Sequence, residues 1–222
     1  MSLSELLREG AGGLWEANFN HPFVRGIGDG SLAEEKFRFY LAQDYVYLKD
    51  FVSFFSLAVA KADRLETMRK FSSFVETTLN YEMELHRSIC ADFGISAGEL
   101  EATLPSPVCL GYTSYLLRTA YEGDLADIAA VLLPCEWGYF DIASRLLRRG
   151  LPAHHHYAKW IETYASTEFE ELVAWCRDLL DRLVPGDDDP SLTHRQAAFN
   201  NALGWEYMFW EMSWHMQTWP ES

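Results

Sequence analysis

A carboxylate at a core position is the first feature of this sequence that could do chemistry. Asp44 lies on an apolar stripe that has the i, i+3, i+4, i+7 spacing of one helix face. The apolar members of that stripe are Phe37, Tyr40, Leu41, Tyr47, Leu48, Phe51 and Phe55. A buried carboxylate there either accepts a tyrosine hydroxyl or caps a neighbouring helix, or it is a fixed hydrogen-bond acceptor for a ligand. Both interpretations stay open at this point.

A second carboxylate, Glu206, repeats this pattern near the end of the chain. Its apolar neighbours in the helical row and along the chain are Phe199, Leu203, Trp205, Tyr207, Phe209 and Trp210. Desolvation in such surroundings raises the pKa of a carboxyl toward the range that suits general acid–base catalysis. The alternative is a core glutamate that is paired with a tyrosine or an arginine.

The third candidate is a cysteine, Cys135. A buried cysteine is usually a small hydrophobic residue, and we keep that interpretation for the other three cysteines. Cys135 differs because Pro134 has no backbone N–H and must distort the preceding turn, and because Tyr139 shares its helix face. The other members of that helical row are Ile128, Leu132 and Ile142. A thiolate nucleophile that works with a neighbouring proton donor is the chemistry that this arrangement indicates.

Helices must position these residues, because apolar residues recur at helical spacing along most of the chain. Ser31 and Glu34 have the spacing of a capping box and predict the start of a helix that reaches about Ala62. Glycine and proline mark the helix ends, and the segment 185–190 is expected to be a loop. Further helices are expected at about 65–93, around 112–116, and at 124–149, 155–164, 168–183 and 191–216.

The fold class follows from what these patterns include and what they lack. No segment alternates apolar and polar residues over the length of a strand, so no sheet is expected. No repeat or change of composition marks a domain boundary. The sequence therefore predicts one all-α domain over residues 1–222, built as a helical bundle.

Composition narrows the partners and the cellular compartment. Of 222 residues, 49% are hydrophobic and 15% aromatic, which suits a sizeable core and a ring-lined cavity. The formal net charge of −15 opposes binding to nucleic acid. No apolar run approaches the ~20 residues of a membrane span. The N-terminal residues do not resemble a secretion signal and the cysteines have no regular spacing, so we expect free thiols in the cytoplasm.

Two pairs of acidic residue and histidine at i, i+4 spacing raise the question of a metal: Glu82 with His86, and Glu211 with His215. Di-iron carboxylate bundles use Glu-x-x-His, which this sequence lacks, whereas pairs four residues apart are common as simple hydrogen bonds. We therefore expect no metal site and no organic cofactor.

A set of motifs, in the same order along nearly the whole chain, resembles the TenA/thiaminase II family of thiamin-salvage enzymes. These motifs are His21-Pro22-Phe23-Val24 with the segment 26–32, Phe37-x-x-Tyr40-Leu41-x-Gln43-Asp44-Tyr45-x-Tyr47-Leu48, Leu133-Pro134-Cys135-Glu136-Trp137-Gly138-Tyr139, Trp160-Ile161-x-x-Tyr164 with Glu168-Phe169, and Glu206-x-x-Phe209-Trp210. The resemblance implies the helical fold shared with haem oxygenases, usually as a homotetramer, with a pocket for a small-molecule aminopyrimidine in place of haem.

The resemblance also implies an activity. The substrate would be 4-amino-5-aminomethyl-2-methylpyrimidine, a thiamin breakdown product, hydrolysed at its exocyclic methylene. The products would be ammonia and the 5-hydroxymethyl pyrimidine from which thiamin is rebuilt. Thiamin itself would be cut at the equivalent bond as a further substrate.

The resemblance assigns roles to the candidates that the residue patterns had already singled out. Cys135 would add to the ring, and Glu206 would protonate the leaving group and then take a proton from water. Asp44 would hold the amino group and a ring nitrogen of the pyrimidine. The tyrosines that would wall the ring are Tyr47, Tyr112, Tyr139 and Tyr164.

Two other functions stay open from the sequence. A non-catalytic pyrimidine-binding protein or regulator would bind the ligand stoichiometrically without turnover. A haem-processing enzyme on the same fold would need an axial histidine beside a larger cavity, and His21, directly before Pro22, is poorly placed for that role.

Overall fold

A computed structural model describes residues 1–184 and 191–220, and the regular structure of this part is entirely helical. The predicted all-α fold is confirmed, while the loop expected at 185–190 lies outside the described residues.

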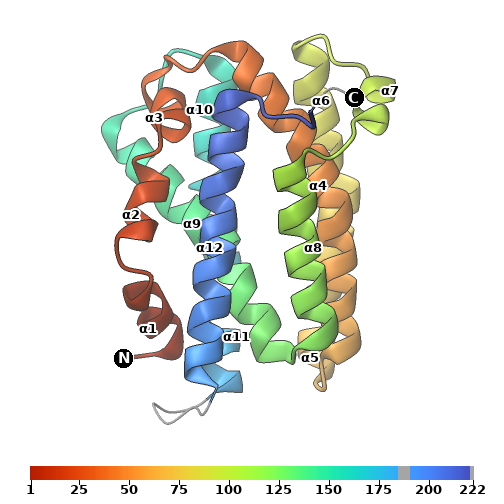
Figure 1. The fold of residues 1–222 in the computed structure, drawn as a ribbon, viewed down its shortest axis with the longest axis vertical. Helices are drawn as coiled ribbons and strands as arrows, with labels where there is room; N and C mark the ends of the chain where they lie inside the picture. Colours follow the sequence, from red (N-terminus) through yellow and green to blue (C-terminus); the bar gives the residue numbers. More distant parts are fainter. Residues whose placement is uncertain (185–190, 221–222) are drawn as a thin grey trace. The chain divides into compact units, whose positions relative to one another are not determined.

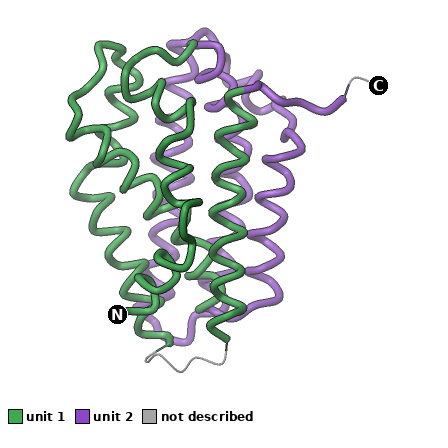
Figure 2. The backbone as a smooth tube through the Cα atoms, turned by 60° about the vertical axis from the view of Figure 1, so that its left-hand side comes forward, with its two compact units in different colours: residues 1–33, 126–214 green, residues 34–125, 215–222 purple. Residues whose placement is uncertain are grey.

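The chain divides into two compact units, coloured separately in Figure 2, and each is described by itself. Unit 1 comprises residues 1–33 and 126–214, and unit 2 comprises residues 34–125 and 215–222. The expectation of a single domain stays a prediction. Within the described residues, no helix is both long and apolar enough to cross a membrane.

Unit 2 is built around one long helix, α4. Its helices are α4 (Glu34–Lys61), α5 (Leu65–Thr77), the π-helix η1 (Thr78–Glu82), α6 (Met83–Asp92), α7 (Ala97–Ala102) and α8 (Pro107–Glu122). The whole predicted stripe of α4 is buried, with Asp44 among its apolar members. The capping box predicts that the helix begins directly after Ser31, but it begins at Glu34. Ser31 donates its backbone N–H to Oδ1 of Asp29 at 2.9 Å, which holds it in the turn before the helix.

A phenylalanine cluster packs α4 against α5. Ring centroids of Phe51 and Phe55 lie 4.3 Å apart, and those of Phe55 and Phe74 lie 5.3 Å apart. Phe54 and Phe71 complete the cluster, and all five side chains are buried. Burial of each ring contributes on the order of 2 kcal/mol, so this cluster anchors the helix pair.

The other side of α4 is fastened to α8, and Figure 1 shows these two helices side by side. The buried amide of Gln43 accepts the N–H of Ser106 at 2.8 Å and donates to the carbonyl of Leu104 at 3.1 Å. Ser106 caps α8 by accepting the N–H of Cys109 at 3.1 Å. Both ends of one amide therefore fix the position of α8 on α4.

A π-helical turn interrupts the helix that the sequence predicts from 65 to 93. In η1 the backbone N–H of Met83 donates to the carbonyl of Thr78, five residues earlier. Such an extra residue in the turn shifts the faces of the following helix, here α6, and helical periodicity does not reveal it. Gly94, in the left-handed region with φ 76°, follows α6 where the sequence predicts its end.

Unit 1 contains the remaining helices. They are α1 (Leu3–Gly10), α2 (Gly13–Phe19), α3 (Pro22–Asp29), α9 (Leu125–Arg149), α10 (His155–Tyr164), α11 (Thr167–Leu183) and α12 (Leu192–His215), with α9 belonging to the unit from residue 126. Ser4 on α1 donates its backbone N–H and its hydroxyl to Asp181 on α11, at 2.8 and 3.0 Å. The buried Tyr157 of α10 donates to the carbonyl of Leu32 at 2.8 Å.

The helix α9 continues through Pro134 without a break. Because proline has no N–H, the carbonyl of Ala130 lacks the helical hydrogen bond that another residue would donate to it. This irregularity lies directly before Cys135, as the sequence predicts.

Candidate functional site

Asp44 is held by a histidine, in the interior of unit 2. Oδ2 of Asp44 lies 2.6 Å from Nε2 of His86, and each side chain is 10% exposed. Asp44 is on α4 and His86 on α6, and the π-helical turn η1 directly precedes α6. The sequence interpretations named a tyrosine or a helix terminus as the partner of this carboxylate, but the partner is an imidazole.

The second nitrogen of His86 is also bonded. Nδ1 lies 3.0 Å from the backbone carbonyl of Glu82, so the i, i+4 pair noted in the sequence interacts through the main chain. Burial lowers the pKa of His86, but the hydrogen bond and the charge of Asp44 outweigh it, and the pKa is raised overall. The geometry therefore favours an imidazolium–carboxylate pair.

Two of the predicted ring-wall tyrosines meet in the same unit. The rings of Tyr47 on α4 and Tyr112 on α8 have centroids 5.3 Å apart, and both side chains are buried. Tyr47 follows Asp44 by three residues, which places the two on one face of α4. Asp44, Tyr47 and Tyr112 thus form one group of candidates in unit 2.

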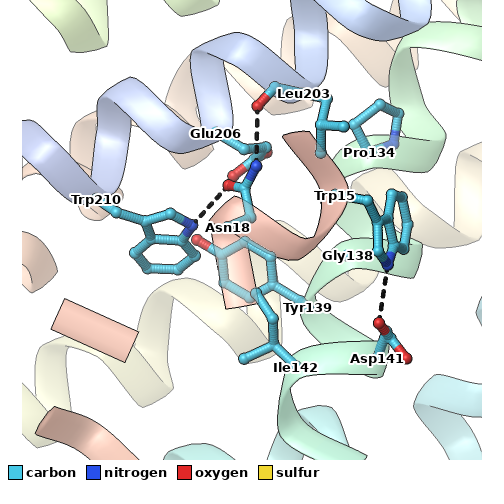
Figure 3. Close-up of a pocket in the computed structure, with 10 residues that line it drawn as sticks. All are labelled: Trp15, Asn18, Pro134, Gly138, Tyr139, Asp141, Ile142, Leu203, Glu206 and Trp210. Carbon is cyan, nitrogen blue, oxygen red and sulfur yellow. Dashed lines mark hydrogen bonds between the residues drawn. The ribbon is translucent and has the colours of Figure 1, made fainter. Parts of the chain in front are cut away.

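Unit 1 contains a pocket that includes two further candidates, shown in Figure 3. It has an empty volume of about 270 Å³, part of it open to solvent. The lining residues come from α2, α9 and α12: Trp15, Asn18, Pro134, Gly138, Tyr139, Asp141, Ile142, Leu203, Glu206 and Trp210. Glu206 is buried at 4% exposure. Glu206 and Tyr139, two of the candidates from the sequence, thus line the same pocket.

Aromatic rings surround Tyr139. Its centroid lies 4.9 Å from that of Tyr164, 5.1 Å from that of Trp210 and 5.7 Å from that of Trp160. The structure therefore brings together the predicted tyrosines of unit 1. Trp160 and Trp210 belong to the same cluster. They stand in the motifs quoted from the sequence, but the sequence analysis did not name them as site residues.

Cys135 has the exposure that a reactive thiol needs. It is half-buried and forms no disulfide, whereas Cys90, Cys109 and Cys176 are buried. Burial raises the pKa of Cys90 and that of Cys109 to about 12, so neither is a thiolate near neutral pH. Cys135 adjoins Pro134 in the chain but is not among the residues that line the pocket of Figure 3.

A buried asparagine fixes the geometry of this pocket. Asn18 accepts the indole N–H of Trp210 at 3.1 Å and donates to the carbonyl of Leu203 at 3.4 Å, both on α12. Trp15, one turn earlier on α2, donates its indole N–H to Asp141 on α9 at 2.8 Å. Figure 3 shows these bonds of Asn18 and Trp15 at the pocket wall. The short helix α2 therefore holds the two long helices that present Tyr139 and Glu206.

His86, Asn18 and Asp141 are polar residues at these sites that the sequence interpretations did not name as site residues. The spacing of Glu82 and His86 was a usable signal, but it pointed to a metal pair or a local bond and not to Asp44. Asn18 stands in a segment with no clear helical period, so the sequence offered no signal for it.

Comparisons with known proteins extend this picture. A relative from Halalkalibacterium halodurans, named aminopyrimidine aminohydrolase, is 43% identical over 222 residues, covering 99% of this chain and 98% of that relative. A solved structure from a Silicibacter species, titled as a TenA family transcription regulator, is 33% identical with a TM-score of 0.90 and covers 96% of both chains.

A third similarity concerns the fold alone. A domain from Shewanella denitrificans with a heme oxygenase-like fold has a TM-score of 0.75 at 15% identity, covering 97% of this chain and 93% of that one. It confirms the haem-oxygenase-like fold that the resemblance implied. The profile of the TENA/THI-4/PQQC family matches residues 10–216, a range that includes every candidate site residue. The chain belongs to the TENA/THI-4/PQQC family.

Proposed function

We propose that this protein is an aminopyrimidine aminohydrolase of thiamin salvage. Its reaction converts 4-amino-5-aminomethyl-2-methylpyrimidine and water into the 5-hydroxymethyl pyrimidine and ammonia. The observation that carries the proposal is the 43% identity, over 99% of the chain, to a relative of that name. The half-buried thiol of Cys135 and the buried carboxyl of Glu206 are chemically suited to this reaction.

The chemistry explains why a thiol is needed. An aminomethyl group on an aromatic ring does not lose ammonia readily, because the ring offers no electron pair until it is dearomatised. Addition of the Cys135 thiolate to a ring carbon forms a C–S bond and supplies that electron pair. The pair then expels the amine, which leaves as ammonia after taking a proton from Glu206, and an exocyclic methylene forms.

The second half of the reaction reverses these steps. Water adds to the methylene and gives its proton to the carboxylate of Glu206, which restores the acid. The C–S bond then breaks, and Cys135 leaves as a thiolate while the ring regains its aromaticity. One water is consumed and one ammonia released, with no net redox change, and the same addition to thiamin would release its thiazole.

The remaining candidates bind and orient the substrate in this proposal. Asp44 accepts a hydrogen bond from the exocyclic amino group. The side chains that pack around the ring are those of Tyr47, Tyr112, Tyr139 and Tyr164. Orientation of this kind lowers the activation barrier by several kcal/mol, and each 1.4 kcal/mol corresponds to about a tenfold change in rate.

We further propose that the protein acts in the cytoplasm, where its cysteines stay reduced, and assembles as a homotetramer. Light scattering of the purified protein tests the tetramer.

Ammonia release from the aminomethyl pyrimidine tests the function directly. Cys135→Ala should abolish turnover while it leaves binding of the 5-hydroxymethyl pyrimidine nearly unchanged. Cys176→Ala is the matched control, since that cysteine is buried on α11 and has no role in the proposed reaction. It should retain activity if its thermal midpoint shows a folded protein.

Other outcomes separate the rival functions. Turnover retained in Cys135→Ala would refute the covalent route but not the reaction. Binding of the pyrimidine by the wild type without any ammonia release would favour a ligand-sensing protein. A Soret band on addition of haem, without pyrimidine binding, would instead favour a haem-processing enzyme.

A further inference from the structure

The bond between His86 and Asp44 has no role in the reaction as proposed so far. It joins α6 to α4 in the interior of unit 2, and its two side chains are each 10% exposed. A histidine buried with a carboxylate is a costly arrangement unless every polar atom is satisfied. The positions of its protons therefore need an explanation.

The distances determine where those protons lie. The backbone carbonyl of Glu82 only accepts, so Nδ1 of His86, at 3.0 Å, must carry a proton. Nε2 lies 2.6 Å from Oδ2 of Asp44, and two lone pairs cannot face each other at that distance in a buried site. A second proton must lie between Nε2 and Oδ2. The pair thus holds two protons, and because the pKa of His86 is raised, we assign both to the imidazole, which leaves Asp44 a carboxylate.

The surrounding groups favour this state. The charge of Asp44 and its hydrogen bond raise the pKa of His86 against the opposing effect of burial. On η1, the charge of Glu82 favours the imidazolium, while burial raises the pKa of Glu82 and so opposes that charge. Burial, together with the charge of Asp44, raises the pKa of Cys90 on α6 and of Cys109 on α8 to about 12, so both thiols stay neutral. Arg38 on α4 and Asp50 on α4 affect these thiols more weakly.

Asp44 keeps acceptor capacity after this pairing. Among the described residues His86 is its single hydrogen-bond partner, through Oδ2, so Oδ1 can still accept a donor. Because imidazolium holds the proton, Oδ1 belongs to a carboxylate and cannot donate. Such an oxygen binds an N–H group, which is what the exocyclic amino group of a 4-aminopyrimidine presents.

We propose that His86 is a positioning residue for substrate recognition: by bonding Oδ2 it fixes the Asp44 carboxylate with Oδ1 as the acceptor for the pyrimidine amino group. This inference rests on the proposed function, in which Asp44 contacts that group. His86 acts through Asp44 and does not touch the reacting atoms. It therefore determines how well an amino-bearing ring is distinguished from one without the amino group.

Two substitutions at His86 test this role. His86→Gln retains an N–H donor close to the position of Nε2 but has no titratable group, and His86→Leu removes the donor. His155→Leu is the matched control, because His155 is exposed at the start of α10. Calorimetry should measure Kd for 5-hydroxymethyl-2-methyl-4-aminopyrimidine and for the same molecule without its 4-amino group. Thermal midpoints establish that each variant is folded.

The expected result is specific to the amino group. His86→Leu should weaken binding of the amino ligand about tenfold to a hundredfold, the effect of losing a hydrogen bond to a charged group. The Kd for the ligand without the amino group should change by less than about threefold, which is well under the tenfold change that 1.4 kcal/mol produces. His86→Gln should recover part of the lost affinity, and KM should change more than kcat.

The pH dependence gives a second readout. Because the folded pKa of His86 is raised, the imidazolium persists above the usual value near 6.5 and is lost as pH rises through the folded pKa. Affinity of the wild type for the amino ligand should fall over that rise, and His86→Gln should lack this fall. Titration of the ligand itself affects both proteins equally, so it cancels in the comparison.

The failures can be told apart. If the wild type neither binds the pyrimidine nor releases ammonia, the proposed function is wrong. If the wild type turns over but His86→Leu weakens both ligands by the same factor, or weakens neither, the positioning role is wrong and His86 only supports the packing of α6 on α4.

Discussion

The bond network of Asn18 leads to a quantitative prediction about the pocket in unit 1. Asn18→Ala removes the acceptor of the Trp210 indole N–H at 3.1 Å and the donor to two carbonyls, that of Leu203 at 3.4 Å and that of Leu14 on its own helix at 3.0 Å. Trp210 is fully buried, so its N–H would lose its bond to Asn18 in a place that water does not reach. Loss of the bond from the buried indole N–H costs about 1–3 kcal/mol and loss of the bonds to the two carbonyls about 1 kcal/mol together, so we expect a loss of roughly 3 kcal/mol.

Urea unfolding followed by far-ultraviolet circular dichroism measures this loss. For a chain of this size a destabilisation of 3 kcal/mol corresponds to a fall in Tm of about 6–12 °C. Asn20→Ala is the matched control, since its side chain donates to the Glu16 carbonyl at 2.8 Å on the exposed side of the same helix region. That substitution should cost less than about 0.5 kcal/mol.

Asn18→Asp is an intermediate case, because its protonated carboxyl retains an acceptor for Trp210 and has one O–H donor in place of the two amide N–H donors. It should lie between wild type and Asn18→Ala at a pH where the new carboxyl is protonated. Equal stabilities of Asn18→Ala and Asn20→Ala would refute the reasoning, since they would mean that the bridge from α2 to α12 carries no net free energy.

Two further predictions concern packing and charge. Gly26→Ala should destabilise the protein by about 1–3 kcal/mol, because a Cβ there would lie 3.0 Å from Cβ and 3.1 Å from the backbone of Leu32. Gly204→Ala meets nothing within 4 Å and should stabilise α12 by up to about 1 kcal/mol in the same urea assay. The hydrogen bond from Tyr45 is the main cause that lowers the pKa of Glu101 to about 2. Carbon-13 NMR should find that carboxyl ionised at pH 3, and any stabilisation it gives should be present above its unfolded pKa and lost as pH falls toward 2.

Long helices were predictable from the sequence because their apolar residues repeat over many turns. The stripe of α4 from Phe37 to Phe55 is buried as predicted, and so is the row that contains Glu206. Short helices were not predictable in the same way, since a helix of seven or eight residues has too few turns to establish a period and depends on tertiary contacts. The helix α3 even contains Gly26 and Gly28, which disfavour a helix but allow a close approach of Leu32 and Leu146, respectively.

The candidate site was predictable only residue by residue. Asp44 and Glu206 stand out because a charged residue interrupts an apolar row, a signal that a single helix carries by itself. The partner of Asp44 is 42 positions away, and the π-helical turn before it changes the face that α6 presents. Pairing over such a separation depends on how helices pack, which the spacing of residues within one helix does not encode.

The neighbouring residues Gln43 and Asp44 show how a buried polar group in a fold can be separated from one that is available to a ligand. Both lie on α4 and both are buried, at 4% and 7% exposure. Gln43 uses its oxygen for Ser106 and its nitrogen for Leu104, so each end of the amide has a partner in the chain. Asp44 uses one oxygen, for His86, and the other stays an acceptor within the described residues. A carboxylate on a buried helix face that still has one oxygen able to accept is suited to bind a donor group of a ligand. By this criterion Gln43 belongs to the packing of α8 on α4, and Asp44 stays the candidate for binding the substrate in the proposed function.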